Sequence, residues 1–196
     1  QHSQSLHAWF AHVPGLRVAM PATVADARDL LIAAVLCPDP VLYIDDRWLY
    51  DQEDELPPVE ERPLHLEGPR CLRRGDDVTL VASGYSTRLA LVAAEQLALD
   101  GVSAEVIDLR VINPYRSDLV VESVARTGRL LAVDGGWGPC GMAGEVIASV
   151  AESGANVFWK SPPRRLTLPF SPAPTSRELE KIYYPNADMV AASAKA

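Results

Sequence analysis

The chain contains 196 residues, of which 48% are hydrophobic and 22% are charged, a composition typical of a globular protein with a substantial core. Its formal net charge of −8 disfavours nucleic acid or an anionic membrane surface as a partner, because both attract clustered positive charge. No apolar run reaches the roughly 20 residues that a membrane-spanning helix needs. We therefore expect no nucleic-acid partner and no membrane partner.

The cysteines are few and far apart. Cys37, Cys71 and Cys140 form no CxxC pair, so neither a disulfide framework nor a cysteine zinc site is indicated. This usage favours reduced thiols in a cytoplasmic protein. Because the sequence starts at Gln1, we also expect it to be a piece of a longer product.

The first fifty residues predict a strand–helix–strand unit. A short opening helix is expected to end at the Pro14-Gly15 turn, because proline removes a backbone donor and glycine permits the turn. A strand over 16–20 follows, and Thr23 with Asp26 forms a capping box that opens the next helix. The predicted inward face of that helix carries Val24, Ala27, Leu30, Leu31, Ala34 and Val35. Residues 41–44 predict a strand buried on both faces.

Residues 45–61 predict a solvated segment. They contain eight acidic residues against a single basic one, Arg47, and prolines cluster near their end. A charge run of this kind is far more often a solvated surface than a ligand site. We therefore expect residues 51–76 to connect two domains across the surface.

From Asp77 onward, predicted strands alternate with predicted helices. The strands are expected at 78–83, 104–111, 129–133 and 157–160, and the helices at 86–100, 117–127, 142–152, 179–183 and 189–194. Such alternation is typical of an α/β domain, in which a mostly parallel sheet carries helices on both faces.

One glycine-rich stretch fits a nucleotide-binding pattern. Residues 136–141, Gly-Trp-Gly-Pro-Cys-Gly, match GxGxxG between a predicted strand and a predicted helix. However, the stretch follows the third strand of its domain, and no strand ending in an acidic residue lies about 20 residues further on. Pro139 also removes one backbone amide from the loop. We therefore interpret the loop as a tight structural turn and keep nucleotide binding as the alternative.

A second loop, residues 83–87, reads Ser-Gly-Tyr-Ser-Thr. It lies at the carboxyl end of its domain's first predicted strand, where open α/β sheets bind ligands. Hydroxyls and free amides at the start of a helix suit an anion. A capped helix without any ligand explains the same residues, and we favour that interpretation.

Three of the four histidines, His2, His7 and His12, lie near the start of the chain. Their spacing of five residues does not place them on one helical face, and they lack the HExxH spacing of a zinc site. A single histidine is more often structural or solvated than catalytic, although His2 is a candidate proton donor or acceptor. No Ser–His–Asp or Cys–His arrangement can be assigned from spacing alone.

Several short stretches, spread from the start of the chain to near its end, together match the pattern of one known family. They are Gln1-His2-Ser3-Gln4-Ser5-Leu6, Trp9-Phe10-Ala11-His12, Pro14-Gly15-Leu16, Val18-Ala19-Met20-Pro21, Val106-Ile107-Asp108-Leu109-Arg110, Thr127-Gly128-Arg129-Leu130 and Leu179-Glu180-Lys181-Ile182-Tyr183. Through this pattern nearly the whole chain resembles the β subunit of the thiamine-diphosphate-dependent 2-oxo-acid dehydrogenases. The resemblance is to the decarboxylating component of the pyruvate and branched-chain type.

The resemblance implies how the chain is divided. Residues 1–50 would close a pyrimidine-binding domain, and residues 51–76 would form the acidic and proline-rich linker. Residues 77–196 would form a transketolase-type C-terminal domain, with a mostly parallel five-stranded sheet flanked by helices. Thiamine diphosphate and its magnesium would be held mainly by a partner subunit or by a segment outside this chain, so no cofactor-binding residue is assigned.

The resemblance also implies partners and one catalytic residue. An α subunit, in a heterotetramer, and a lipoyl acyltransferase core are the implied partners. His2 would give or take a proton as the acyl group passes to lipoamide. Ser3 and Gln4 would position His2 or the substrate through hydrogen bonds.

A monovalent-cation site, for potassium, is a further implication. It would use the carbonyl of Ala34 and the side chain of Asp39. Cys37 and Pro38 stand where the family usually has polar residues, which is a departure from its pattern.

The expected function is thus one part of an enzyme for oxidative decarboxylation of a 2-oxo acid with acyl transfer to lipoamide, inactive by itself. One alternative is a non-catalytic module for subunit docking and assembly. Another is the C-terminal part of a different thiamine-diphosphate enzyme, such as a transketolase or a deoxyxylulose-phosphate synthase. The pattern leaves open which 2-oxo acid is used.

Overall fold

The computed structural model describes residues 4–59, 61–155 and 157–196. The strands are β1 (Arg17–Ala19), β2 (Val41–Tyr43), β3 (Arg70–Arg73), β4 (Val78–Ala82), β5 (Ala104–Asp108), β6 (Val111–Asn113), β7 (Leu130–Trp137) and β8 (Arg164–Leu168). The α-helices are α1 (His7–Ala11), α2 (Val24–Val35), α3 (Tyr85–Leu99), α4 (Asp118–Thr127), α5 (Met142–Glu152), α6 (Arg177–Tyr183) and α7 (Ala187–Lys195). Two short 3-10 helices, η1 (Arg47–Leu49) and η2 (Leu64–Leu66), lie between β2 and β3.

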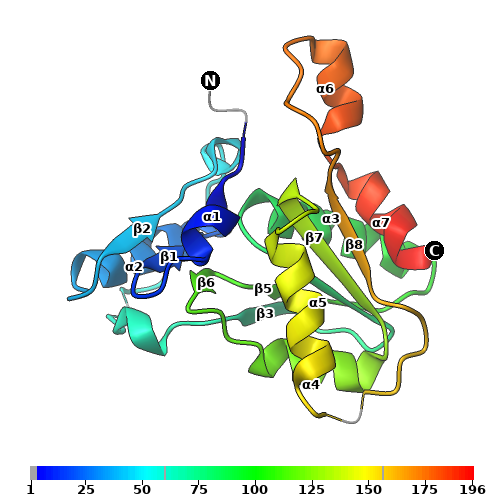
Figure 1. The fold of residues 1–196 in the computed structure, drawn as a ribbon, viewed down its shortest axis with the longest axis horizontal. Coiled ribbons are helices and arrows are strands. Elements are labelled where there is room, and N and C mark those ends of the chain that lie inside the picture. The colour runs from blue at the N-terminus through cyan, green and yellow to red at the C-terminus, as the bar shows by residue number, and fades with distance from the viewer. Residues whose placement is uncertain (1–3, 60, 156) are drawn as a thin grey trace.

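Two sheets organise these elements (Figure 1). The smaller sheet has the order β2-β1-β6, and the larger sheet has the order β3-β5-β4-β7-β8. In the larger sheet β5, β4, β7 and β8 are parallel, and only the edge strand β3 is antiparallel to its neighbour. The prediction of an α/β fold with a mostly parallel five-stranded sheet is confirmed.

The N-terminal unit follows the predicted strand–helix–strand order, with β1 and β2 parallel. Thr23 caps α2 as expected, because its side-chain oxygen accepts the Asp26 amide at 3.1 Å. The predicted inward face was wrong in part: Leu30 is buried, but Leu31 and Val35 are exposed. The helix turns the side that carries Asp26 and Leu30 inward, because the buried Asp26 binds charged partners there.

Two further predictions, for β2 and for the linker, need correction. Strand β2 is an edge strand and only half-buried, not buried on both faces. Residues 51–59 are exposed as predicted, but residues 70–73, which were placed in the linker, form β3 of the larger sheet. Strand β3 is an antiparallel edge strand and is only partly covered, so its sequence, Arg-Cys-Leu-Arg, does not need the apolar pattern by which a buried strand is recognised.

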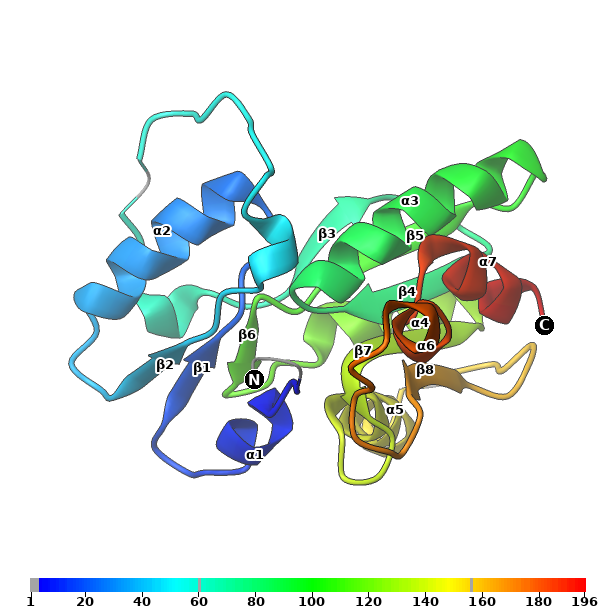
Figure 2. The same ribbon diagram turned by 90° about the horizontal axis from the view of Figure 1, so that it is seen from above.

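The segment predicted as one strand over 104–111 is divided between two sheets. Strand β5 ends at Asp108, and Arg110 adopts a left-handed conformation with φ of 58°. The chain then continues as β6, which leaves the larger sheet and pairs antiparallel with β1 (Figure 2). The C-terminal domain therefore supplies the third strand of the N-terminal unit's sheet.

The last predicted strand was misplaced. Residues 157–160 form no strand, whereas β8 runs over Arg164–Leu168 and pairs parallel with β7. In the loop before β8, the Lys160 amide donates to the Gly128 carbonyl at 2.9 Å. The hydrophobic pattern pointed to Val157–Lys160, while β8 begins with two exposed arginines at the edge of the sheet.

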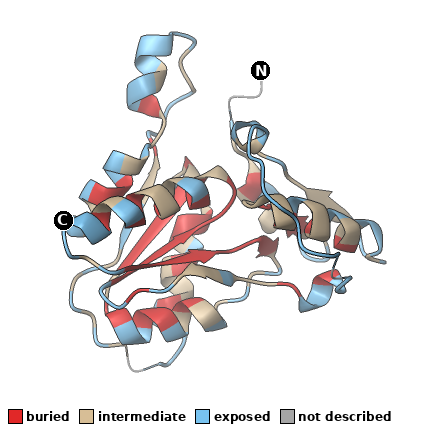
Figure 3. Cartoon of the chain, turned by 180° about the vertical axis from the view of Figure 1, so that it is seen from behind, coloured by how far each residue is buried: buried red, intermediate tan, exposed pale blue. Residues whose placement is uncertain are grey.

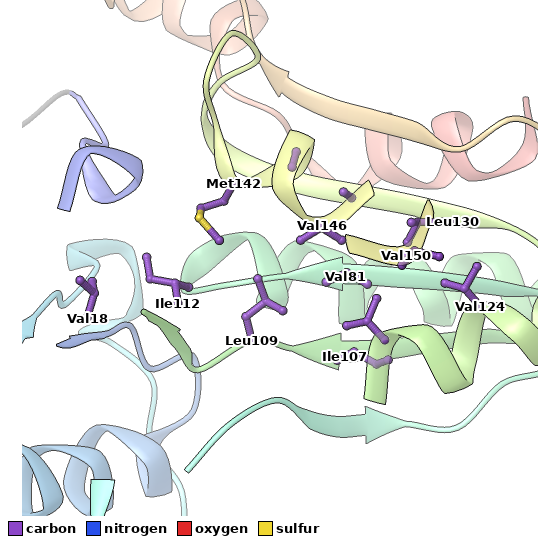
Figure 4. Close-up of a cluster of buried hydrophobic side chains, with 13 residues drawn as sticks. Val18, Val81, Ile107, Leu109, Ile112, Val124, Leu130, Met142, Val146 and Val150 are labelled. Atoms are coloured by element: carbon purple, nitrogen blue, oxygen red, sulfur yellow. The ribbon is translucent and has the colours of Figure 1, made fainter. Parts of the chain in front are cut away.

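Hydrophobic layers cover both faces of the larger sheet, whose strands are largely buried (Figure 3). Helices α3 and α7 pack against one face, and helices α4 and α5 pack against the other. The second layer also includes Val18 of β1 and Ile112 of β6, so that the core continues from the C-terminal domain into the N-terminal unit (Figure 4). In the described part of the chain, no helix has the length and apolar character needed to cross a membrane.

Candidate active site

A cleft of about 590 Å³ lies between the N-terminal unit and the C-terminal domain. It lies at the carboxyl ends of strands, because Ile44 follows β2, Ser83 follows β4 and Gly135 stands near the end of β7. Helix α3 leads from β4 to β5 at one side, whereas α5 leads from β7 to β8 at the other. The strand order reverses between β4 and β7, which is where open α/β sheets bind ligands.

A buried histidine joins the N-terminal segment to the C-terminal domain beside this cleft. His7 opens α1, and its Nε2 atom lies 3.0 Å from Oδ1 of Asp134 in β7. On the other side of the ring, Nδ1 lies 2.7 Å from the Ser5 hydroxyl oxygen. His7 and Asp134 are only 2% and 4% exposed, whereas Ser5 and His7 both line the cleft. The sequence analysis favoured a structural or solvated role for a single histidine such as His7, but the partner Asp134 could not be found from spacing.

The glycine-rich loop wraps around the Asp134 carboxylate. The amides of Gly136 and Ala143 donate to Asp134 at 2.8 Å and 3.1 Å, so the start of α5 already holds an anion. A Cβ atom at Gly141 would lie 2.2 Å from the Trp137 carbonyl oxygen, which explains that glycine by close packing. These contacts support the interpretation of residues 136–141 as a structural turn rather than a nucleotide-binding loop.

The loop over residues 83–87 is a sharp entry into α3. Gly84 caps the helix with φ of 53°, and a Cβ atom there would lie 2.6 Å from Cε of Met20. Thr87 turns away from the cleft and donates to the buried carboxylate of Asp108 at 3.2 Å. Ser86 lines the cleft. The loop thus starts a helix as expected, and it also lines the cleft.

An aromatic group closes one side of the cleft. The Trp48 ring of η1 packs edge-on against Tyr85 and Tyr184, with centroids 4.8 Å and 5.3 Å away. Burial raises the pKa of Asp46, the cap of η1, although its carboxylate accepts the amides of Trp48 and Tyr85. The start of the acidic segment is therefore packed over the cleft, which its charge pattern did not indicate.

A second buried group holds the two halves together behind the cleft. The Arg110 guanidinium donates to Asp26 of α2 at 2.7 Å and to Glu67 at 2.5 Å. Arg70 also lies 3.0 Å from Asp26. All of these charges except that of Arg70 are nearly fully buried. Sequence reasoning missed this network, because its members come from three segments that are far apart in the sequence.

Only some of the residues predicted to act in catalysis or cation binding lie within the described part of the chain. His2 and Ser3 lie outside the described residues, whereas Gln4 is exposed and lines the cleft. The Ala34 carbonyl accepts the Cys37 amide at 3.2 Å. The other predicted cation ligand, Asp39, forms an ion pair with Arg17 at 2.7 Å. Among residues 4–59, 61–155 and 157–196, no three His, Cys, Asp or Glu side chains are grouped to hold a metal ion.

Two family models match the chain. The transketolase C-terminal domain matches residues 69–190, and the transketolase pyrimidine-binding domain matches residues 1–52. A solved structure described as a split gene transketolase, inactive β4 tetramer, superposes with a TM-score of 0.73 at 25% identity. The superposition covers 96% of this chain and 60% of that chain.

Curated relatives are similar over the whole length of this chain. The pyruvate dehydrogenase E1 component subunit beta of Rhizobium meliloti is 39% identical over 100% of this chain and 42% of its own length. The acetoin:2,6-dichlorophenolindophenol oxidoreductase subunit beta of Cupriavidus necator is 38% identical over 100% of this chain and 57% of its own. The pyruvate dehydrogenase E1 component subunit beta-1 of Arabidopsis thaliana mitochondria is also 38% identical, over 55% of its length.

The chain thus spans about half the length of the curated relatives that it matches. The resemblance to β subunits that was noted in the sequence is confirmed by these similarities. The C-terminal match covers well over half of the residues and includes every strand of the larger sheet. The chain therefore belongs to the transketolase C-terminal domain family.

Proposed function

We propose that the chain is part of the β subunit of a thiamine-diphosphate-dependent 2-oxo-acid dehydrogenase. The intact enzyme would decarboxylate a 2-oxo acid oxidatively and transfer the acyl group to lipoamide. The observation that carries the proposal is the similarity to E1 β subunits over the full length of this chain, at 39% identity. The cleft at the carboxyl ends of β4 and β7 supports it, because that is where a ligand of this fold would lie.

The residues around the cleft fit one side of a shared cofactor site. They supply an aromatic and apolar wall, but Arg47, beside the acidic Asp45 and Asp46, is the only arginine or lysine among the described residues that line the cleft. The amides at the start of α5 already bind Asp134, so they offer no cradle for a diphosphate. We infer that a partner subunit or a segment outside this chain holds the diphosphate and magnesium. When bound, thiamine diphosphate would supply the carbanion chemistry of decarboxylation.

His2, Ser3 and Gln4 remain the proposed reactive segment. His2 would give or take a proton during acyl transfer, and Ser3 and Gln4 would position it or the substrate. Gln4 lies at the cleft, which supports this placement. A potassium site at Ala34 and Asp39 would have to displace the Cys37 amide and Arg17, so we do not include potassium in the proposal.

The proposed assembly is a heterotetramer with an α subunit, docked on a lipoyl acyltransferase core in the cytoplasm. Residues 1–50 would belong to the pyrimidine-binding domain. The linker would end at residue 69 rather than residue 76, because β3 starts at Arg70 in the larger sheet. The C-terminal domain would then be residues 70–196.

The experiment is to express this chain within its full gene product together with the candidate α subunit. Reduction of 2,6-dichlorophenolindophenol by 2-oxo acids, and acylation of lipoamide, would be measured with and without thiamine diphosphate. Cofactor-dependent turnover is expected, and His2→Ala should lower lipoamide acylation by about 100-fold. His12→Ala is the matched control, because His12 is exposed after α1, and it should leave the rate unchanged. Unaltered acylation in His2→Ala would remove His2 from the proposed chemistry.

A second candidate is oxidation of acetoin instead of a 2-oxo acid. The relative named for acetoin is 38% identical over this whole chain, almost the same as the pyruvate relative at 39%. Acetoin and pyruvate compared in the same dye-reduction assay would separate the two substrates. A complex that assembles but turns over neither substrate would favour the docking-module alternative.

A further inference from the structure

Ser5, His7 and Asp134 form a connected set at the edge of the cleft that the proposed function does not use. The Ser5 hydroxyl oxygen lies 2.7 Å from Nδ1 of His7, and Nε2 of His7 lies 3.0 Å from Oδ1 of Asp134. Ser5 is half-buried and lines the cleft, whereas the other two side chains are buried. The set therefore runs from the cleft into the interior.

Asp134 is held as an anion at the inner end. Burial by itself raises the pKa of Asp134, but contact with His7 and the amides of Gly136 and Ala143 hold that pKa below its ordinary value. Both carboxylate oxygens are fixed, one by each amide. The negative charge at this position is thus permanent near neutral pH and cannot rotate away.

The Asp134 carboxylate determines which ring nitrogen of His7 carries the proton. A carboxylate only accepts protons, so we assign the ring proton to Nε2, which faces Asp134. Although the N–H bond is not aligned for a hydrogen bond, the 3.0 Å approach makes the contact electrostatically favourable. Nδ1 then keeps its lone pair, which points at the Ser5 hydroxyl and can accept its proton.

Gly136 makes room for this arrangement. A Cβ atom at that position would lie 3.2 Å from Cε1 of His7 and 3.2 Å from Oδ1 of Asp134. The same atom would lie 3.6 Å from the Ser5 carbonyl oxygen. The absence of a side chain at Gly136 therefore lets the segment that carries Ser5 and His7 lie directly against β7.

We propose that Ser5 is a nucleophile that faces the cleft, with His7 as its general base and Asp134 as the anion that orients the ring. A nucleophile bonded to a base that a third group orients is the arrangement that activates a hydroxyl. The ligand class is an ester or thioester. Ser5 Oγ would attack the acyl carbon, its proton would pass to His7 Nδ1, and the leaving alcohol or thiol would take that proton. The proposal does not depend on a bound cofactor.

The test uses the full chain and a fluorophosphonate probe. Ser5 Oγ would bond to phosphorus, fluoride would leave, and His7 would take the hydroxyl proton. Mass spectrometry of peptides would give the labelling rate at Ser5 and at Ser176, an exposed serine before α6 that is the internal control. We expect Ser5 to be labelled about 100-fold faster than Ser176, the effect of a positioned general base.

Variants show whether Ser5 is labelled because His7 activates its hydroxyl or only because Ser5 is accessible to the probe. His7→Gln keeps a polar side chain but cannot take the proton, so labelling of Ser5 should fall about 100-fold, to the Ser176 level. Asp134→Asn should lower it by a smaller factor, and Ser5→Ala should abolish it. Circular dichroism would check that each variant is folded. Equal labelling of Ser5 and Ser176 in the unaltered chain, or full labelling in a folded His7→Gln variant, would overturn the proposal.

Discussion

Replacing Arg110 by methionine tests whether the buried ion network holds the two halves of the chain together. The side chain of Arg110 is 4% exposed and lies between Asp26, 1% exposed, and Glu67, 8% exposed. Methionine fills a similar volume without charge. Because neither residue is glycine, the left-handed backbone at φ of 58° costs the same in both chains and does not contribute to the difference.

The cost follows from the two carboxylates that lose their buried partner. Removing one member of a buried charge pair costs roughly 3–5 kcal/mol, because the remaining charge stays desolvated and uncompensated. Arg70 remains 3.0 Å from Asp26, and Arg62 remains 3.8 Å from Glu67, and both are partly exposed. These contacts retain part of the compensation. We therefore expect the lower end, a loss of about 3 kcal/mol in the free energy of unfolding.

Urea unfolding followed by circular dichroism at pH 7 measures this loss. With a slope of about 2 kcal/mol per molar urea, the midpoint should fall by about 1.5 M. Arg88→Met is the matched control, because Arg88 is exposed on α3 and both residues favour helix equally. That variant should stay within about 0.5 kcal/mol of the parent. A loss below about 1 kcal/mol for Arg110→Met would refute the reasoning that this network is essential.

Three more predictions test the interior and the cleft. Burial raises the pKa of Asp108 from 3.8 to about 7, so the folded chain keeps a proton that the unfolded chain loses. Stability should therefore fall as the pH rises through that window, and Asp108→Asn should flatten the fall in urea midpoints between pH 5 and pH 8. Gly136→Ala should cost about 1–3 kcal/mol by displacing His7, whereas Gly144→Ala within α5 should stabilise by about 0.5–1 kcal/mol; thermal unfolding compares them. Trp48→Ala should lose about 1–3 kcal/mol from its two ring contacts, seen as a lower urea midpoint.

The elements of the C-terminal domain could be predicted from the sequence because their signals are local. Residues 78–82 form a fully buried strand of mostly apolar side chains, and Gly128 ends α4 in the left-handed conformation that glycine favours. The failures have a different cause. Strands β3 and β8 lie at the two edges of the sheet and carry arginines. Whether such a segment forms a strand depends on the neighbouring strand with which it pairs rather than on its own residues.

The candidate site was less predictable than the fold. Of the three residues predicted to act in the chemistry, Gln4 lines the cleft, whereas His2 and Ser3 lie outside the described residues and their roles stay predictions. The pairing of His7 with Asp134 depends on contacts between segments far apart in the sequence, which periodicity does not encode. The contact of Trp48 with Tyr85 was missed for a local reason. The acidic residues around Trp48 predicted a solvent-exposed segment, although its aromatic ring favours packing.

The cleft owes its shape to the short crossing at residues 109–113. There the Met20 amide donates to the Arg110 carbonyl at 2.7 Å, and Val18 pairs with Asn113 across β1 and β6. The Asn113 side chain also donates to the Val13 and Leu16 carbonyls, at 2.9 Å and 2.6 Å, and so fixes the turn that follows α1. Because α1 carries His7, this crossing sets where the histidine meets β7. A change at Arg110 should therefore slow the labelling of Ser5 as well as lower stability, because Arg110 lies within this crossing.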